Sequence, residues 1–288
     1  MCAQQLPIIA LMTDFGTADA YAAAMKGVIL GITPAARLVD LTHEIAPGDV
    51  PQAAYVLLTV YASFPAHTVF VVVVDPGVGT ARRALAVETA HGRFVGPDNG
   101  VFSYVLRQHA PLAQVEITNV AYTLPQHSNT FHGRDIFAPA AAHLAAGLPL
   151  NRLGPPLRDS VALPQPRLDI APGEVRGEVL HIDRFGNVVT SIGSLSWRDE
   201  DTLQLEPRFG AARRGMALPA RVSVAAGGAM VEGVRRSYGL AAPGETVALV
   251  NSAGQLELAV NRGHAARALG VGVGDSVIVR FGEGGGLT

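Results

Sequence analysis

The chain has very little of several residue types on which common protein classes depend. Its 288 residues include a single cysteine, Cys2, so neither a disulfide within the chain nor a thiolate zinc site can form. Gly27 follows the only lysine, Lys26, so a Walker phosphate loop, which needs Ser or Thr there, is excluded. Charged residues make up only 16%, with 22 basic against 24 acidic side chains, so we expect no nucleic-acid partner.

Long hydrophobic runs and targeting signals are missing as well. The longest apolar run, residues 69–74, is far too short to span a membrane, and no basic segment precedes the apolar stretch 8–12. We therefore expect a cytoplasmic protein with no membrane partner. The nine histidines lack the spacing of a known metal cluster, and Pro47 takes the place of the second histidine in a zinc-protease motif beginning at His43. We expect neither a metal nor another cofactor.

Hydrophobic residues make up 49% of the chain, enough to bury a large core and to exclude intrinsic disorder. In the first half, short β-branched runs alternate with amphipathic stretches, a pattern that predicts an α/β domain with a mostly parallel sheet and flanking helices. The expected strands are 7–12, 37–41, 68–74, 84–89 and 114–118, and the expected helices 19–30, 49–61, 99–109 and 135–146. Active sites in such sheets lie beyond the carboxyl ends of the strands.

A proline-rich segment divides the chain. Pro164, Pro166 and Pro172 stand within nine positions, which is typical of a domain boundary. Beyond it, short strands separated by Gly, Asn and Ser turns predict a smaller all-β domain, a barrel or a sandwich. The expected strands are 175–182, 188–192, 202–205, 220–225, 246–250, 256–260 and 276–281. We predict an α/β domain at 1–163, a linker at 164–174 and an all-β domain at 175–288.

Asp14 lies directly after the first strand, in the segment Met12-Thr13-Asp14-Phe15-Gly16. An aspartate at a strand-to-helix turn most often caps the helix, and on position alone this role is favoured. A carboxylate at the end of a strand can instead accept both hydroxyls of a ribose, as in nucleotide-binding folds.

Asp75 and Arg82 follow the most apolar strand, on either side of a glycine turn. An aspartate that ends a buried strand needs a partner to remain ionised, and Arg82 is the nearest candidate. Such a pair can close a turn or belong to an active site, and both readings stay open. His132 precedes an Ala-rich helix that Asp135 is expected to cap; alone, it could be an ordinary loop residue.

Polar turns of the second domain form the last group of candidates: 183–187, 237–239 and 251–254. Each can be a plain turn between strands, since Asn, Gly, Asp and Ser are the usual turn residues. As ligand groups they would offer an amide for the edge of a base, aromatic faces for stacking and a carboxylate for an ammonium group.

Together these segments resemble the S-adenosylmethionine (SAM) hydroxide adenosyltransferases, formerly DUF62, which are relatives of the SAM-dependent fluorinase and chlorinase. The resemblance runs from about Ile8 to Phe281. Its most specific pieces are Thr13-Asp14-Phe15-Gly16, Asp75-Pro76-Gly77-Val78-Gly79-Thr80, Pro97-Asp98-Asn99-Gly100, Thr130-Phe131-His132-Gly133-Arg134-Asp135, Phe185-Gly186-Asn187 and Asn251-Ser252.

The resemblance implies an enzyme that converts SAM and water into adenosine and methionine. The family's hydrolases have an Asp, an Arg seven residues later and a distant His, which fall on Asp75, Arg82 and His132. In this scheme Arg82 supplies positive charge, Asp75 orients it, and His132 accepts a hydrogen bond or a proton from the attacking water.

The resemblance also implies how the substrate is held. Asp14 would bind the ribose diol, Asn187 the adenine edge, Phe185 and Tyr238 the two faces of the base, and Asp183 and Ser252 the methionine end. In the family, such sites form between neighbouring subunits of a homotrimer, so we expect the same assembly here.

Departures from the pattern separate this chain from the halogenases. Those enzymes carry an insertion between the segments around Ala84 and Phe94, and they replace four residues of this chain: Asp75 and His132 by Tyr, Gly133 by Ser, and Gly48 by Trp. These differences argue against halogenation. Ala253 stands where the halogenases have an Arg near the methionine carboxylate, which leaves recognition of that group open. A non-catalytic adenosine or SAM sensor is the alternative function.

Overall fold

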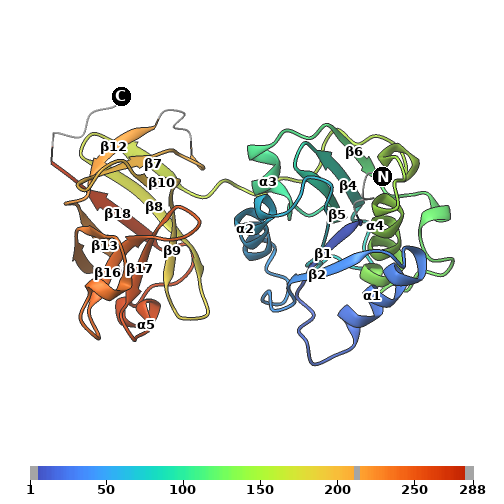
Figure 1. The fold of residues 1–288 in the computed structure, drawn as a ribbon, viewed down its shortest axis with the longest axis horizontal. Helices are drawn as coiled ribbons and strands as arrows, with labels where there is room; N and C mark the ends of the chain where they lie inside the picture. Colours follow the sequence, from blue (N-terminus) through green and yellow to red (C-terminus); the bar gives the residue numbers. More distant parts are fainter. Residues whose placement is uncertain (1–5, 211–214, 283–288) are drawn as a thin grey trace. The chain divides into compact units, whose positions relative to one another are not determined.

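The computed structural model describes residues 6–210 and 215–282, and Cys2 lies outside this range. Contacts divide the chain into two compact units, Met1–Leu163 and Pro164–Thr288, called here the N-terminal and the C-terminal unit (Figure 1). The N-terminal unit is α/β and the C-terminal unit is almost entirely β, so the expected fold class is confirmed.

The N-terminal unit is built on a six-stranded sheet in the order β2-β1-β3-β5-β4-β6. The strands are β1 (Ile8–Thr13), β2 (Arg37–Thr42), β3 (Val69–Val73), β4 (Ala84–Thr89), β5 (Gly92–Pro97) and β6 (Ala113–Glu116). Strands β2, β1, β3 and β5 pair in parallel, and β4 is antiparallel to both of its neighbours. The sequence did not predict β5, because glycines and a proline, which usually mark turns, take three of its positions.

Helices cover both faces of this sheet (Figure 1). They are α1 (Tyr21–Ile32), α2 (Val50–Val60), α3 (Ser103–Gln108) and α4 (Ala138–Ala145). Ile9 and Leu11 share a buried cluster with α1 and α4, whereas Ala10 and Met12 are buried on the opposite face. Among the described residues, no helix is long and apolar enough to cross a bilayer.

Two predicted helices begin differently from expectation. α3 starts at Ser103 because Asn99 holds a turn: its amide donates to the Val74 carbonyl and its oxygen accepts from the Val101 N–H. α4 is preceded by a π-helical turn, η3 (Gly133–Phe137), closed by a bond from the Ala138 N–H to the Gly133 carbonyl. Asp135 therefore lies inside helical structure and caps nothing. Its buried carboxylate instead accepts from the Ser128 N–H at 2.7 Å.

The C-terminal unit contains a nine-stranded sheet and a three-stranded sheet, β10-β11-β12. The larger sheet runs β14-β13-β18-β8-β9-β17-β16-β15, with β7 paired to β8. Its end strands β14 and β15 are consecutive in the chain, so the sheet curls back on itself as a nearly closed barrel. The strands are β7 (Leu168–Ala171), β8 (Glu174–Ile182), β9 (Val188–Gly193), β10 (Leu195–Trp197), β11 (Thr202–Leu205), β12 (Met216–Pro219), β13 (Ser223–Ala226), β14 (Ala229–Glu232), β15 (Val234–Arg235), β16 (Thr246–Val250), β17 (Gln255–Val260) and β18 (Ser276–Arg280).

The proline-rich segment 164–174 is not a plain linker. Strand β7 lies within it and pairs with β8, so most of the segment belongs to the barrel. The prolines hide this strand from pattern reading, and the short strands β10, β12, β14 and β15 and the short helix α5 (Ala265–Leu269) give no periodic signal long enough to detect.

Candidate active site

Asp14 and Asp75 lie at the same edge of the N-terminal sheet. Each follows the carboxyl end of a strand, β1 or β3, and these two strands are neighbours. Asp14 Oδ2 accepts a 2.8 Å hydrogen bond from the N–H of Gly48, whose φ of +73° suits glycine. A Cβ on Gly48 would lie 3.5 Å from Pro76, so the Gly48 loop lies against both Asp14 and the loop that carries Asp75. The cap hypothesis was wrong: Ala20 stands at the N-cap of α1, and no side chain caps that helix.

A polar chain that runs from the buried Thr13 and His43 to the more exposed Asp40 and Lys26 supports the Asp14 turn, and sequence reasoning missed it. His43 Nδ1 lies 2.9 Å from the Thr13 hydroxyl, and that hydroxyl oxygen accepts from the Phe15 N–H. The other ring nitrogen of His43 lies 3.1 Å from Asp40, which pairs with Lys26. These bonds fix the backbone on both sides of Asp14. No motif joins the four side chains, so only the folded arrangement reveals them.

Arg82 and Asp75 form the expected ion pair. Arg82 Nε lies 3.0 Å from each carboxylate oxygen of Asp75, and an Arg82 terminal nitrogen also bonds to Asp75. The two side chains are only 11% and 6% exposed, so solvent screens their interaction weakly. The guanidinium also lies over the Phe137 ring, 5.1 Å from its centroid. Its orientation is therefore fixed from two sides.

His132 joins this pair through Arg82. The same terminal nitrogen of Arg82 lies 2.8 Å from His132 Nδ1. Gly79 allows the approach of the two loops, since a Cβ there would lie 2.4 Å from the Asn129 carbonyl oxygen. Asp75, Arg82 and His132, seven and fifty residues apart in the chain, thus form one continuous hydrogen-bonded chain.

The direction of the hydrogen bond between Arg82 and His132 determines which ring nitrogen of His132 carries the proton. Arginine only donates, so Nδ1 must accept, and the proton of the neutral ring resides on Nε2. Burial lowers the pKa of His132, and the positive charge of Arg82 lowers it further. At neutral pH the ring is therefore neutral and presents Nε2–H, a donor. In this tautomer His132 offers a donor to a bound water, whereas accepting a hydrogen bond or a proton from water would require Nε2 without its hydrogen, and that expected role stays a prediction.

In the C-terminal unit, Asp183 organises the turn that carries Phe185 and Asn187. Its Oδ1 accepts from the N–H groups of Phe185 and Asn187, and its Oδ2 accepts from the Asn187 side-chain amide, all at 2.9 Å. Asn187 is buried but keeps its side-chain oxygen and one amide hydrogen for another partner, whereas Phe185 is 75% exposed. Asp183 thus holds Asn187 in one orientation.

Tyr238 belongs to a second group in the same unit, together with Glu257 and Asn251. The Tyr238 hydroxyl donates to Glu257 at 2.6 Å, and the Asn251 amide donates to the other Glu257 oxygen at 3.2 Å. Burial and this bond to Glu257 raise the pKa of Tyr238, so its hydroxyl remains a donor at neutral pH. Ser252 is exposed in the turn 251–254. Glu257 was not predicted, because it follows the ordinary pattern of a strand.

The structure thus gathers the predicted residues into two clusters. Asp14, Asp75, Arg82 and His132 lie in the N-terminal unit, and Asp183, Phe185, Asn187, Tyr238 and Ser252 lie in the C-terminal unit.

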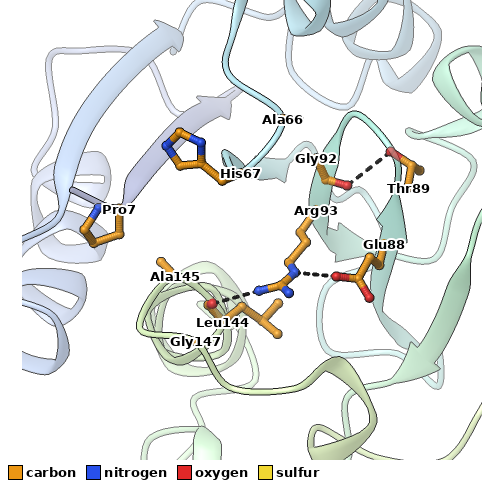
Figure 2. Close-up of a pocket in the computed structure, with 10 residues that line it drawn as sticks. All are labelled: Pro7, Ala66, His67, Glu88, Thr89, Gly92, Arg93, Leu144, Ala145 and Gly147. Carbon is orange, nitrogen blue, oxygen red and sulfur yellow. Dashed lines mark hydrogen bonds and ion pairs between the residues drawn. The ribbon is translucent and has the colours of Figure 1, made fainter. Parts of the chain in front are cut away.

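A cavity of about 300 Å³ lies elsewhere in the N-terminal unit, where β3 and β5 begin (Figure 2). Arg93 points into it but donates to Glu88 at 2.8 Å and to the Leu144 carbonyl at 3.0 Å. These two bonds use two of the five guanidinium N–H donors, and Glu88 already balances the charge of Arg93. This cavity contains none of the predicted site residues. It lies at the amino end of the strands, away from Asp14 and Asp75.

The two units and their clusters define a two-domain protein, an α/β domain followed by a barrel-like β domain. The SAM hydroxide adenosyltransferase N-terminal domain matches residues 9–154, and the C-terminal domain of the same family matches residues 177–278. The chain therefore belongs to the SAM hydroxide adenosyltransferase family, and the resemblance of its motifs is confirmed.

Individual relatives agree with this assignment. A protein of Salinispora tropica named (R)-S-adenosyl-L-methionine hydrolase is 42% identical, covering 96% of this chain and 98% of its own. A fluorinase of an Actinoplanes species is 33% identical over 65% of this chain and 72% of its own. The crystal structure of an uncharacterized conserved protein from Thermotoga maritima has a TM-score of 0.82 and 37% identity, covering 95% of this chain and all of that one.

Proposed function

We propose that this protein hydrolyses SAM to adenosine and methionine. The observation that carries the proposal is the partly buried chain of Asp75, Arg82 and His132 at the carboxyl edge of the sheet, in a protein 42% identical to a named SAM hydrolase. The relative's name specifies the (R) sulfonium, so this epimer is the first substrate to test.

The chemistry requires a strong nucleophile and no acid for the leaving group. Hydroxide forms a bond to ribose C5′ while the C5′–S bond breaks, and methionine leaves with the electron pair as a neutral thioether. The proton that water loses passes to solvent. The positive charge of Arg82 and the Nε2–H of His132 favour hydroxide over water, since both stabilise a bound anion. Asp75 keeps Arg82 in place and, because it is already paired, is not needed as a base.

The substrate-binding roles follow from the free atoms of each cluster. Asp14 uses Oδ2 to accept from Gly48, and its remaining lone pairs can accept both ribose hydroxyls. Asn187 has one acceptor and one donor left, which match the amino group and ring nitrogen at an adenine edge. Phe185 and Tyr238 offer exposed rings for the base, and Asp183 and Ser252 are assigned to the methionine end.

The proposal is tested by incubating the purified protein with SAM and separating the products by chromatography. Adenosine and methionine are expected in equal amounts over many turnovers. Stoichiometric binding without product would instead identify a sensor. Formation of 5′-halo-5′-deoxyadenosine in chloride or fluoride would identify a halogenase.

Asn187→Ala and Asp14→Ala are expected to weaken adenosine binding. Each substitution leaves a polar edge of the ligand unpaired, at a cost of about 1–3 kcal/mol. Calorimetric titration with adenosine measures the effect, and Asn119→Ala, in a surface turn of the N-terminal unit, is the control. Wild-type affinity in either variant would remove that residue from the proposed site.

Turnover is expected to fall on acidification as His132 becomes protonated. The pKa of His132 is lowered from 6.5, so the ring is half-protonated only at a pH below that value. Protonation places a second donor against Arg82 and breaks the chain. The profile of kcat/KM against pH measures this, with His143→Ala as control, because burial lowers the pKa of that distant histidine too. A decline with its midpoint above pH 6.5 would contradict the assignment.

We further propose that the active unit is a homotrimer in a cytoplasmic setting, with each site shared between neighbouring subunits. The distribution of the predicted residues over two units supports a shared site, because one ligand must contact both clusters. The exposed Phe185 and Tyr238 rings fit surfaces that are covered when the site is complete.

A further inference from the structure

Glu257 is the centre of the C-terminal cluster, although the proposed reaction has no step for it. It lies in β17 and is 3% exposed, with Oε1 bonded to the Tyr238 hydroxyl and Oε2 to the Asn251 amide. Among residues 6–210 and 215–282, no cationic side chain forms an ion pair with it. Its partners are therefore two neutral donors.

Stability alone does not account for a carboxylate at this position. Burying a charge without a counter-ion costs free energy, and a neutral or apolar residue in the same strand would avoid that cost. Burial indeed raises the pKa of Glu257, and the negative charge of Asp183 raises it further. The group must therefore serve the arrangement of its partners.

Both partners belong to segments assigned to the substrate. Tyr238 begins a short 3-10 helix, η5 (Tyr238–Leu240), and the residue is 44% exposed, so the bond of its hydroxyl to Glu257 restrains the far end of the ring. Asn251 Oδ1 accepts from the N–H groups of Ala253 and Gln255, while its amide donates to Glu257. One carboxylate thus holds both the aromatic ring and the turn that contains Ser252.

We propose that Glu257 is a positioning residue for substrate binding, which fixes the Tyr238 ring and the turn 251–254 in the orientation that receives the nucleoside. The inference rests on the proposed function, because its readouts are adenosine affinity and SAM turnover. Glu257 acts through Tyr238 and Asn251 and touches no reacting atom. Its loss should therefore raise KM and the Kd for adenosine without lowering kcat.

The test is a double-mutant cycle of Glu257→Gln and Tyr238→Phe, with adenosine Kd measured by calorimetry. In Glu257→Gln one of the two acceptor oxygens becomes an amide NH2, so either the Asn251 amide faces a donor or the Tyr238 hydroxyl must turn from donating to accepting, and we expect about tenfold weaker binding. The double variant should bind no more weakly than Glu257→Gln alone, and kcat at saturating SAM should stay within about twofold of wild type. Glu232→Gln, an exposed carboxylate of the same barrel bonded to Ser223, should change neither value.

Additive losses, or unchanged adenosine affinity in Glu257→Gln, would overturn the proposal. If Glu257→Gln does not fold, as judged by its melting temperature, Tyr238→Phe alone decides, because wild-type affinity there would show that the hydroxyl bond is not needed. The wild type separates this inference from the proposed function. If it binds adenosine without turning over SAM, the hydrolase assignment fails while the cycle still tests Glu257, and if it does not bind adenosine, both fail.

Discussion

Arg82→Ala is expected to lower kcat for SAM by about 10²- to 10³-fold, with adenosine affinity within about threefold of wild type. Arg82 connects Asp75 to His132, so its loss removes the fixed positive charge and also leaves His132 without its donor. Because the three side chains act as a unit, the double variant Asp75→Ala/Arg82→Ala should lose little more than Arg82→Ala alone. Single-turnover kinetics and calorimetry measure the two quantities separately.

Arg93→Ala is the matched control. Arg93 forms the same kind of ion pair, with Glu88, but at the amino end of the strands in the same unit. Its replacement should leave kcat unchanged. Equal losses of turnover and adenosine affinity in Arg82→Ala would show that Arg82 supports the fold or the ligand instead of the nucleophile.

Coexpression of Asp75→Ala chains with Asn187→Ala chains is expected to restore activity that neither variant has alone at SAM concentrations well below KM. The first substitution damages the cluster of the N-terminal unit and the second damages that of the C-terminal unit. If each site combines two subunits of a cyclic trimer, about one site in three has two intact faces in every trimer that contains both variants. Differently tagged chains, purified through both tags, provide verified mixed oligomers.

A site within one chain predicts the opposite result. Every chain in the mixture then carries one damaged cluster, and no combination restores it. Absence of activity in verified mixed oligomers would end the shared-site proposal. Simple mixing of the two purified homo-oligomers, without exchange of subunits, is the negative control.

The fold could be predicted where the chain repeats a pattern over enough residues. An unbroken apolar run predicts the buried strand Val69–Val73, and the regular spacing of apolar residues along one face predicts α2. β5 and β7 could not be predicted in this way, because glycines and prolines within or around them are ordinary turn signals. In these strands, pairing with a neighbour outweighs local preference.

Part of the candidate site could be predicted from the sequence, and part depends on contacts between distant segments. The pairing of Asp75 with Arg82 follows from a short separation and the need of a buried carboxylate for a counter-ion. The proton position on His132 could not be predicted, because it depends on which ring nitrogen meets Arg82 across fifty residues of chain. The role of Glu257 could not be predicted either, because a glutamate in a strand usually faces solvent. Glu257 is buried only because the sheet curls into a barrel.

The π-helical turn after His132 places one more residue between its hydrogen-bonded groups than an α-helical turn would. Removing one residue from Gly133–Phe137 would convert that turn to α-helix and rotate His132 by about 100° around the axis of α4. The contact of His132 with Arg82 thus depends on the one extra residue in this turn. We therefore expect the loss of one codon at this point to move His132 away from Arg82.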